Sequence, residues 1–449
     1  MTTHDNTLAE APISSSSRTG LFALWGANGI SAMGGAMTNV AIPWFILQTT
    51  GSAAMTGLVA TAMTLGGVLS GVLSGPVIDR IGFKRSSVVT DVVSTFLIAG
   101  IPLLYAAGAL PFWLIMVLVF VITCIQGPGD AARYALVPGL AHRAGMTIER
   151  ANGVDRAIAK ATLLVGPILG GLLIVALGPQ NVLLVDAVTF AASAALVALL
   201  VRARTHEEGA AAAPTQIGRR YRADLLVGLK FIFSNGLLLS LVAVVSLANA
   251  LDGALATVVL PVYARDIWGD PAAFGALLSA LGAGALIGAA IFGAIGHRMP
   301  RRLVFLLGGA AGATLLYGGL ALTPPLGLML VLALVGAAVA GPIVPLVFTV
   351  VQTITPADVY GRVFGALQSL SIAFAPLVIS IVGFMIEGAG LRRTILALGA
   401  VYLAVLLGML FNPFLRRMDG GRTSGTKPGK ATSANAGQLT VHSDAGGSR

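Results

Sequence analysis

The sequence predicts an all-α membrane protein whose twelve transmembrane helices form two pseudo-symmetric six-helix bundles. Of its 449 residues, 56% are hydrophobic and only 10% are charged, whereas soluble domains carry about 25% charged residues. The mean hydropathy is +0.89. Apolar stretches long enough to cross a bilayer, about 20 residues each, follow one another along the chain. One polar stretch divides them into two sets of six.

The first half contains six predicted spans. No charged residue occurs from Thr19 to Ile78, a stretch long enough for two spans joined by the hinge TTGSA. The other four spans are expected at Ser86–Ala107, Pro111–Leu140, Ala151–Leu177 and Asn181–Val201. We therefore expect a cytoplasmic N-terminal tail at 1–19 and the N-terminal bundle at 20–201.

A polar linker at 202–235 separates the halves. Its last part, ADLLVGLKFIF, favours an amphipathic helix on the membrane surface. The second set of spans is expected at Gly236–Ala264, Ala272–Gly296, Leu303–Ala357 (two spans), Gly361–Ile386 and Thr394–Leu415. These spans form the C-terminal bundle at 236–415. The tail at 416–449 is rich in Gly, Ser, Thr and Lys, a composition typical of disorder.

The basic residues orient the predicted spans. With the N-terminus inside, the outer loops contain only Arg265, Arg392 and Arg393 of the 28 Lys and Arg residues. Inner loops carry the excess of basic residues in membrane proteins. We therefore expect both termini and the linker in the cytoplasm and the helices in the plasma (inner) membrane.

The two halves also repeat each other. The pattern Gly75-x-x-x-Asp79-Arg80 returns in the second half as Gly293-x-x-x-His297-Arg298, and Gly127-Pro128 returns as Gly341-Pro342. The two patterns are displaced along the chain by nearly the same offset. Similar offsets at two places predict duplication of a six-helix unit, which is a common way to build transporters.

Composition and motifs exclude several other classes of protein. The net charge of +10 does not indicate nucleic-acid binding, because the basic residues form no stripe. The five histidines never occur at metal-ligand spacing. Neither a Gly-x-Ser-x-Gly elbow nor a Gly-x-x-x-x-Gly-Lys-Ser/Thr phosphate loop is present. We expect no enzyme, no cofactor, no metal and no nucleic-acid partner.

The loop GPVIDRIGFKR, Gly75 to Arg85, lies between the second and third spans. With twelve spans in two sets of six, it resembles the signature loop of the major facilitator superfamily. In the fifth span, Gly166, Pro167, Gly170 and Gly171 resemble a motif of proton-driven exporters. Further stretches are similar to the proton/drug antiporter branch that includes macrolide efflux and enterobactin export proteins: VAIPWFILQTTGSA, GDAARYALVPGL, ANG, DAVTF and YGRVFG. The resemblance covers roughly residues 20–415.

The sequence departs from this branch at four positions. Phe83 and Ser94 stand where arginines are usual, and Thr162 replaces the first glycine of the fifth-span motif. Gly35 stands where the branch often has an acid. That last difference matters most, because it removes a possible proton carrier from the first span.

The first candidate site is a charged latch at the inner face. Asp79 and Arg80 end the second span, and Asp130 and Arg133 share one side of the fourth because of their i, i+3 spacing. An unpaired charge in the membrane costs about 3 kcal/mol, so these groups need partners. The superfamily resemblance implies a latch that opens during transport, and static pairing is the alternative. The same region contains Gly75, Gly82, Lys84, Arg85 and Asp91.

The second candidate site is a central cavity. Asp252 lies near mid-membrane in the seventh span with no other charge beside it, so it must pair, face water or bind a proton. A proton site, a contact to a cationic substrate and a structural hydrogen bond stay open as roles. Asn249, Asn39 and Trp44 are the other cavity candidates, although an interfacial aromatic belt also explains Trp44. For Asp186, in the sixth span, we favour a structural role.

Two glycine patterns predict helix contacts. Gly67, Gly71 and Gly75 share one face of the second span, where small residues favour close packing. Static packing is the favoured interpretation, and a surface that slides during transport is the alternative. The motif Gly166, Pro167, Gly170 and Gly171 predicts either a leak-proof contact between the halves or an ordinary kink.

These features predict a secondary transporter that exports an amphiphilic small molecule, such as a drug, siderophore or secondary metabolite, in exchange for protons. Its expected partners are this substrate, protons and membrane lipid, and we favour a monomer. Proton-independent transport or uptake of a metabolite or lipid is the alternative, which Gly35 supports. A membrane receptor is less favoured, because the chain shows no large soluble domain.

Overall fold

The computed structural model describes residues 15–201 and 225–418, and within these ranges the chain is almost entirely helical and contains no strand. Twelve of the described helical segments are long and apolar enough to cross a membrane. The predicted tails, apart from a few residues next to the bundles, and most of the predicted linker lie outside the described residues.

The N-terminal bundle consists of six continuous helices: α1 (Ser15–Thr50), α2 (Ala53–Ile81), α3 (Phe83–Ala106), α4 (Phe112–Arg143), α5 (Ile148–Leu177) and α6 (Pro179–Leu200). The Ser52 hydroxyl caps α2 by accepting a hydrogen bond from the Met55 amide. Single glycines reverse the chain between two helix pairs. Gly82 and Gly178 have φ values of 84° and 82°, a conformation that a side chain would strain.

The C-terminal bundle has the same order, but its spans are more often interrupted. They are α8–η1–α9–η2 (Gly236–Ala254, Leu255–Val259, Leu260–Tyr263, Ala264–Trp268), α10–η3 (Pro271–Ile295, Gly296–Arg298), α11–η4–α12 (Arg301–Ala313, Thr314–Gly318, Gly319–Leu322), α13–α14 (Leu326–Ala340, Ile343–Ile354), α15–α16 (Tyr360–Ala373, Ala375–Ala389) and α17 (Leu391–Leu410). The elements η1, η2 and η4 are π-helical turns, which are frequent at functional sites. A short 3₁₀ turn, η5 (Pro413–Met418), follows.

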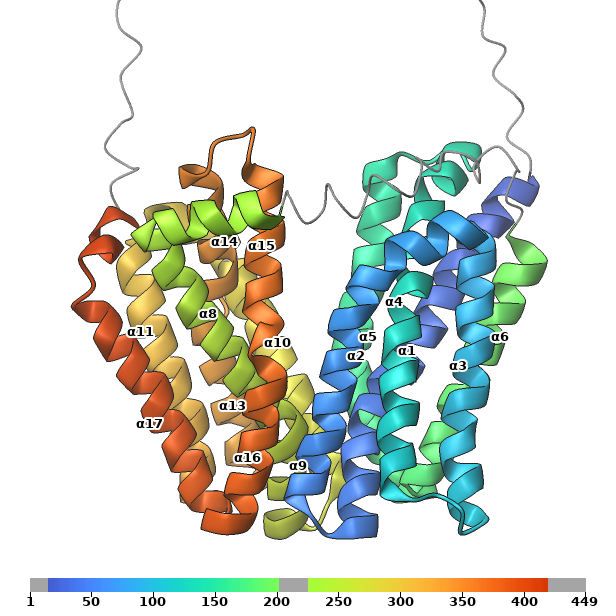
Figure 1. Cartoon of the computed structure of the whole chain (residues 1–449), viewed down its shortest axis with the longest axis horizontal. Coiled ribbons are helices and arrows are strands. Elements are labelled where there is room, and N and C mark those ends of the chain that lie inside the picture. The colour runs from blue at the N-terminus through green and yellow to red at the C-terminus, as the bar shows by residue number, and fades with distance from the viewer. Residues whose placement is uncertain (1–14, 202–224, 419–449) are drawn as a thin grey trace, which may run out of the picture.

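A helix at Leu225–Ser234 precedes α8 and lies across the end of the C-terminal bundle (Figure 1). Its Ile232 is fully buried, in the same apolar cluster as Leu238 and Val363. Phe233 is 62% exposed. The helix therefore packs one side on the bundle and leaves an apolar residue on the other.

The bundles meet at only one of their two ends (Figure 1). We call the end at which α1 begins and α17 ends the terminal face, and the opposite end the sealed face. Contacts between the bundles run mainly from α5 to α10 and from α2 to α16. Near the sealed face, the Thr61 hydroxyl on α2 lies 2.7 Å from the Ser380 hydroxyl on α16. Toward the terminal face the two bundles diverge.

The glycine face of α2 shows this divergence. A Cβ atom built on Gly67, Gly71 or Gly75 would meet nothing within 4 Å, so the expectation of static packing is wrong for this conformation. The glycine of α2 that does pack on α4 is Gly66, whose Cβ would lie 2.6 Å from the Phe120 carbonyl oxygen. The half of α2 that is nearer the terminal face thus borders open space between the bundles.

Candidate functional site

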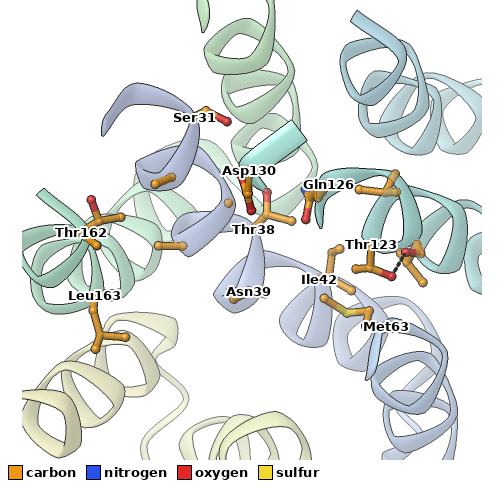
Figure 2. Close-up of a pocket in the computed structure, with 16 residues that line it drawn as sticks. Ser31, Thr38, Asn39, Ile42, Met63, Thr123, Gln126, Asp130, Thr162 and Leu163 are labelled. Carbon is orange, nitrogen blue, oxygen red and sulfur yellow. Dashed lines mark hydrogen bonds between the residues drawn. The ribbon is translucent and has the colours of Figure 1, made fainter. Parts of the chain in front are cut away.

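A cavity of about 300 Å³ lies within the N-terminal bundle. Residues of α1, α2, α4 and α5 surround it (Figure 2). Its polar lining residues are Ser31, Thr38, Asn39, Thr123, Gln126, Asp130 and Thr162. The rest of the wall is apolar, and a largely apolar wall with a few placed polar groups is typical of small-molecule sites.

Of the two cavity candidates in α1, only one borders this space. Asn39 is exposed and lines the cavity. Trp44 is 9% exposed and belongs to the main apolar core. The structure therefore places Asn39, but not Trp44, where a ligand would contact it.

Asp252 lies on α8, just before the π-helical turn η1. Its side chain is exposed and forms no hydrogen bond or ion pair with any residue in 15–201 or 225–418. Asn249, one turn earlier, is also exposed and donates to the Ser371 carbonyl oxygen at 3.2 Å. Tyr317 and Tyr402 lie within electrostatic range of Asp252. The hydroxyl of Tyr317 is buried and has no partner among the described atoms.

The internal repeat relates Asp252 to the cavity wall. Aligning Gly127 with Gly341 places Asp252 opposite Thr38 of α1, and aligning Gly75 with Gly293 places it opposite Gly34. The segment between these two positions contains the cavity-lining residues Gly35 and Ala36, and Thr38 also lines the cavity. The repeat thus places Asp252 opposite the stretch of α1 that contains cavity-lining residues.

Arg133 forms the centre of a buried charge network. Its Nη1 donates to both carboxylate oxygens of Asp91, at 2.9 and 2.8 Å, and its Nη2 donates to Asp130 at 2.6 Å. The Ser193 hydroxyl donates to Asp91 at 2.6 Å. Arg133 and Asp91 are 5% and 2% exposed, whereas the side chain of Asp130 is 57% exposed and faces the cavity. The network therefore links α3, α4 and α6 to the cavity wall.

The other residues of the candidate latch lie apart from this network. Asp79 and Arg80 are exposed at the end of α2, and neither forms a hydrogen bond or ion pair with another residue in the part of the chain described here. Asp91, which we grouped with the signature loop, lies inside the network. In this conformation the structure brings Asp91, Asp130 and Arg133 together and leaves Asp79 and Arg80 free.

Within the signature loop, Gly82 is the single residue that joins α2 to α3. Lys84 donates from Nζ to the carbonyl oxygen of Ala198, in the last turn of α6, at 2.8 Å. A cation is favourable at the C-terminal end of a helix. Arg85 is exposed. The loop thus ties the start of α3 to the end of α6.

The glycines of the fifth-span motif lie at close helix contacts. A Cβ on Gly170 would lie 3.0 Å from Met37 Cα of α1, and one on Gly171 would lie 2.7 Å from the carbonyl oxygen of Pro271 in the other bundle. A Cβ on Gly275 of α10 would overlap the carbonyl oxygen of Pro167. Gly166 faces Ala36 in the same way. The motif therefore lets α5 approach both α1 and α10.

A pair of charged residues at the sealed face was not predicted as a site. Arg265 of η2 donates from Nη1 to the carbonyl oxygens of Leu47 (3.4 Å) and Gly51 (3.2 Å), at the end of α1. Glu387 of α16 accepts hydrogen bonds from the Ser52 hydroxyl and from the Ala54 amide (3.2 Å), at the start of α2.

Both charges match the dipoles of the helices they contact, since a cation suits a C-terminus and an anion an N-terminus. We call Arg265 and Glu387, with these helix ends, the clasp. The sequence signal for it is a charged residue near the end of a largely apolar span, a position where a charge needs a partner.

Comparisons with known proteins agree with this architecture. The sequence profile of the Major Facilitator Superfamily matches residues 24–378 and 242–439. The chain is 33% identical over 395 residues to the multidrug efflux pump Tap of Mycolicibacterium fortuitum, covering 86% of this chain and 94% of that protein. It is 32% identical over 400 residues to the pump of the same name from Mycobacterium tuberculosis, covering 87% and 92%.

Solved structures with low sequence identity share the fold. The nucleoside transporter NupG aligns with a TM-score of 0.70 at 13% identity, covering 87% of this chain and 98% of that one. A POT family transporter in complex with 5-aminolevulinic acid aligns with a TM-score of 0.66 at 14% identity, covering 88% and 96%.

Proposed function

The chain belongs to the Major Facilitator Superfamily, and we propose that it exports amphiphilic small molecules in exchange for protons by alternating access. Membership of this family makes it a membrane transporter and not an enzyme. One observation carries the proposal: the bundles are clasped at one face while, toward the other face, α2 borders open space. This is the arrangement expected of one state in an alternating-access cycle.

The terminal face is the cytoplasmic face in this proposal. Lys84 and Arg85 of the signature loop, and Arg301 and Arg302 of the repeated loop, lie at that face, and basic residues concentrate in cytoplasmic loops. Both termini then lie in the cytoplasm of a cell with this protein in its plasma (inner) membrane. The structure corresponds to the state that loads substrate from the cytoplasm.

The cavity supports an amphiphilic substrate. Its apolar wall suits an apolar body, while Asn39, Gln126 and Asp130 offer hydrogen bonds and a negative charge. Export as the direction draws support from the relatives, which are named as multidrug efflux pumps. Asp130 is partly neutralised by Arg133, so the free carboxylate of Asp252 is the stronger anchor for a cationic group.

Coupling to protons follows from competition at Asp252. A carboxylate without a protein partner can bind a proton on one leg of the cycle and the cationic group of a substrate on the other. Each proton that enters brings about 2.3 kcal/mol per 100 mV of membrane potential. Closing the terminal face would bring the end of α2, with Asp79 and Arg80, toward the C-terminal bundle. Pairing of Asp79 and Arg80 with Asp130 and Arg133 would need a movement within the N-terminal bundle, because α2 and α4 both belong to it.

A vesicle assay tests the proposal. Inverted membrane vesicles containing the protein are energised, and a pH-sensitive dye reports proton release on addition of lipophilic cations such as ethidium. We expect dye recovery with the wild type and its loss with Asp252→Asn. Asp358→Asn, which changes an exposed acid in a loop, should behave as the wild type. Compound movement without proton flux would support a proton-independent transporter, and no response to any compound would refute proton-coupled export.

A further inference from the structure

Asp186 is a carboxyl group buried in the N-terminal bundle, and it has no charged partner among residues 15–201 and 225–418. It lies on α6 and is 0% exposed. One carboxyl oxygen accepts a hydrogen bond from the Thr38 hydroxyl of α1, and the other accepts from the Thr189 hydroxyl at 3.0 Å. Opposite it, a Cβ on Gly34 would overlap the oxygens of Asp186 and Thr189. The two helices are therefore fitted around this carboxyl group.

The helices packed against α6 bring no cation to Asp186. These are α1, α3 and α5. The transmembrane part of α1 carries no charge between Thr19 and Thr50. On α3, Asp91 is bound to Arg133 and Ser193, and Lys84 reaches Ala198 near the far end of α6. The remaining titratable side chains on α3 and α5 form no hydrogen bond or ion pair with Asp186: Arg85, Tyr105, Glu149, Arg150, Asp155, Arg156 and Lys160.

Hydroxyl donors alone leave a full negative charge poorly compensated inside a membrane, where an unpaired charge costs about 3 kcal/mol. A proton removes that charge without changing the shape of the side chain. Static helix bonding alone would not require an acid at this position, because an asparagine of the same size could accept from one hydroxyl and donate to the other. The burial and the partners of Asp186 thus fit a group that holds a proton.

Thr38 connects this group to the cavity. It is 6% exposed and lines the cavity together with Asn39 and Gln126 (Figure 2). A hydroxyl group can donate and accept at the same time. When Asp186 is protonated, the Thr38 hydroxyl can turn to accept from the carboxylic acid and to donate to a cavity water. The proton on Asp186 can then pass to the Thr38 oxygen while the original Thr38 proton passes to that water. This step leaves a carboxylate, an intact hydroxyl and a hydronium ion.

We propose that Asp186 is a second proton-binding site of the transporter, loaded and unloaded from the cavity through the Thr38 hydroxyl. The proposal rests on the proposed function, since it adds a proton site to a proton-coupled cycle. It also assigns Asp186 a role beyond the structural one that the sequence favours. Substrate need not touch Asp186, because no atom of this residue lines the cavity.

Infrared spectroscopy of the reconstituted full-length protein tests the proposal without a substrate. The wild type should show a carbonyl stretching band of a protonated carboxylic acid that disappears at high pH. Because Asp252 also binds a proton in the proposed function, the band is followed in the Asp252→Asn background, where it should remain, and in Asp186→Asn/Asp252→Asn, where it should be lost. A band that is the same in Asp252→Asn and in the double variant would refute the proposal, as would the absence of any such band in Asp252→Asn.

Two matched threonine variants test the route. Thr38→Val and Thr189→Val each remove one hydroxyl that donates to Asp186, but only Thr38 lines the cavity. On transfer to D₂O, the deuterium shift of the Asp186 band should be slower in Thr38→Val and unchanged in Thr189→Val. Equal rates in both variants would refute the route through Thr38. Failure of the vesicle assay alongside an intact Asp186 band would overturn proton-coupled export but leave proton binding at Asp186 in place.

Discussion

The two bundles share one order of helices but use their charges differently. In the N-terminal bundle, Asp91, Asp130 and Arg133 pair with one another. Aligning Gly127-Pro128 with Gly341-Pro342 places Val344 and Val347 where the other bundle has Asp130 and Arg133. Val347 belongs to an apolar cluster of buried residues with Phe305 and Leu346. One bundle thus joins its third and fourth spans through ion pairs, and the other through hydrophobic packing.

This difference indicates that the fold itself does not need the charge network. Replacing a buried ion network by apolar residues is often neutral or stabilising, whereas removal of one member is costly. The exposed carboxylate of Asp130 connects the network to the cavity wall. A role of these charges in transport, beyond stability, is therefore part of the proposed function.

Removal of Arg133 should have the largest effect on stability. Arg133→Met leaves Asp91 buried without its cation, and we expect a loss of about 3–5 kcal/mol in the free energy of unfolding. Denaturant unfolding of the purified protein in detergent micelles measures it. Arg150→Met, at an exposed site, should stay within about 0.5 kcal/mol of the wild type. A small loss for both variants would show that the network contributes little to stability.

Replacing the charges of this network with apolar residues, as in the C-terminal bundle, should restore the lost free energy of unfolding. The triple variant Asp91→Leu/Asp130→Val/Arg133→Val removes every charged member of the network, and its stability should return to within about 2 kcal/mol of the wild type. Transport of ethidium in vesicles should nevertheless remain lost, because the latch and the cavity carboxylate are absent. Full transport by a stable triple variant would show that the network serves stability alone.

The architecture was more predictable from the sequence than the contacts. The expected hinge TTGSA between the first two spans agrees with the observed end of α1 at Thr50 and start of α2 at Ala53, because apolar length and turn residues are local signals. The static packing expected at Gly67 and Gly71 was wrong, since glycine spacing identifies a face but not what lies opposite.

Partners distant in sequence were harder still to predict. The contact of Gly34 with Asp186 joins the first helix to the sixth, and that of Ser52 with Glu387 joins the two bundles. Neither follows from a local pattern. The cavity shows the same limit: Asn39 lies in its wall, whereas Trp44, little more than one turn further along α1, is buried in the core.

The C-terminal bundle uses two of its charges in the clasp, where Arg265 and Glu387 contact helices of the N-terminal bundle. Arg265→Gln/Glu387→Gln should weaken closure of the sealed face by about 1.5–3 kcal/mol for each charged group. Spin labels at Thr50 and Ala389 should then show a larger population at long distance. Asp266→Asn is the control, because Asp266 pairs with Arg265 at 2.7 Å without bridging the bundles. An unchanged distance distribution in the double variant would exclude the clasp as a gate.

The smallest expected effect on stability concerns a contact that both bundles form. Lys84 follows Gly75 in the signature loop at the same spacing as Arg302 follows Gly293 in the repeat. Lys84 donates to the carbonyl oxygen of Ala198 at the end of α6, and Arg302 donates from Nη2 to that of Leu410, at the end of α17, at 2.9 Å. The repeated loop therefore has no acid at the position of Asp79 but has a cation at the end of the sixth helix of its bundle.

Lys84→Met and Arg302→Met should each cost about 0.3–1 kcal/mol, since each removes a favourable charge from a helix C-terminus. Because the role is the same in both bundles, the two losses should be similar and should add in the double variant, as expected for distant sites. Denaturant unfolding measures the sum. Loss of transport in Lys84→Met alone, at equal stability, would contradict a shared capping role and make Lys84 part of the latch instead.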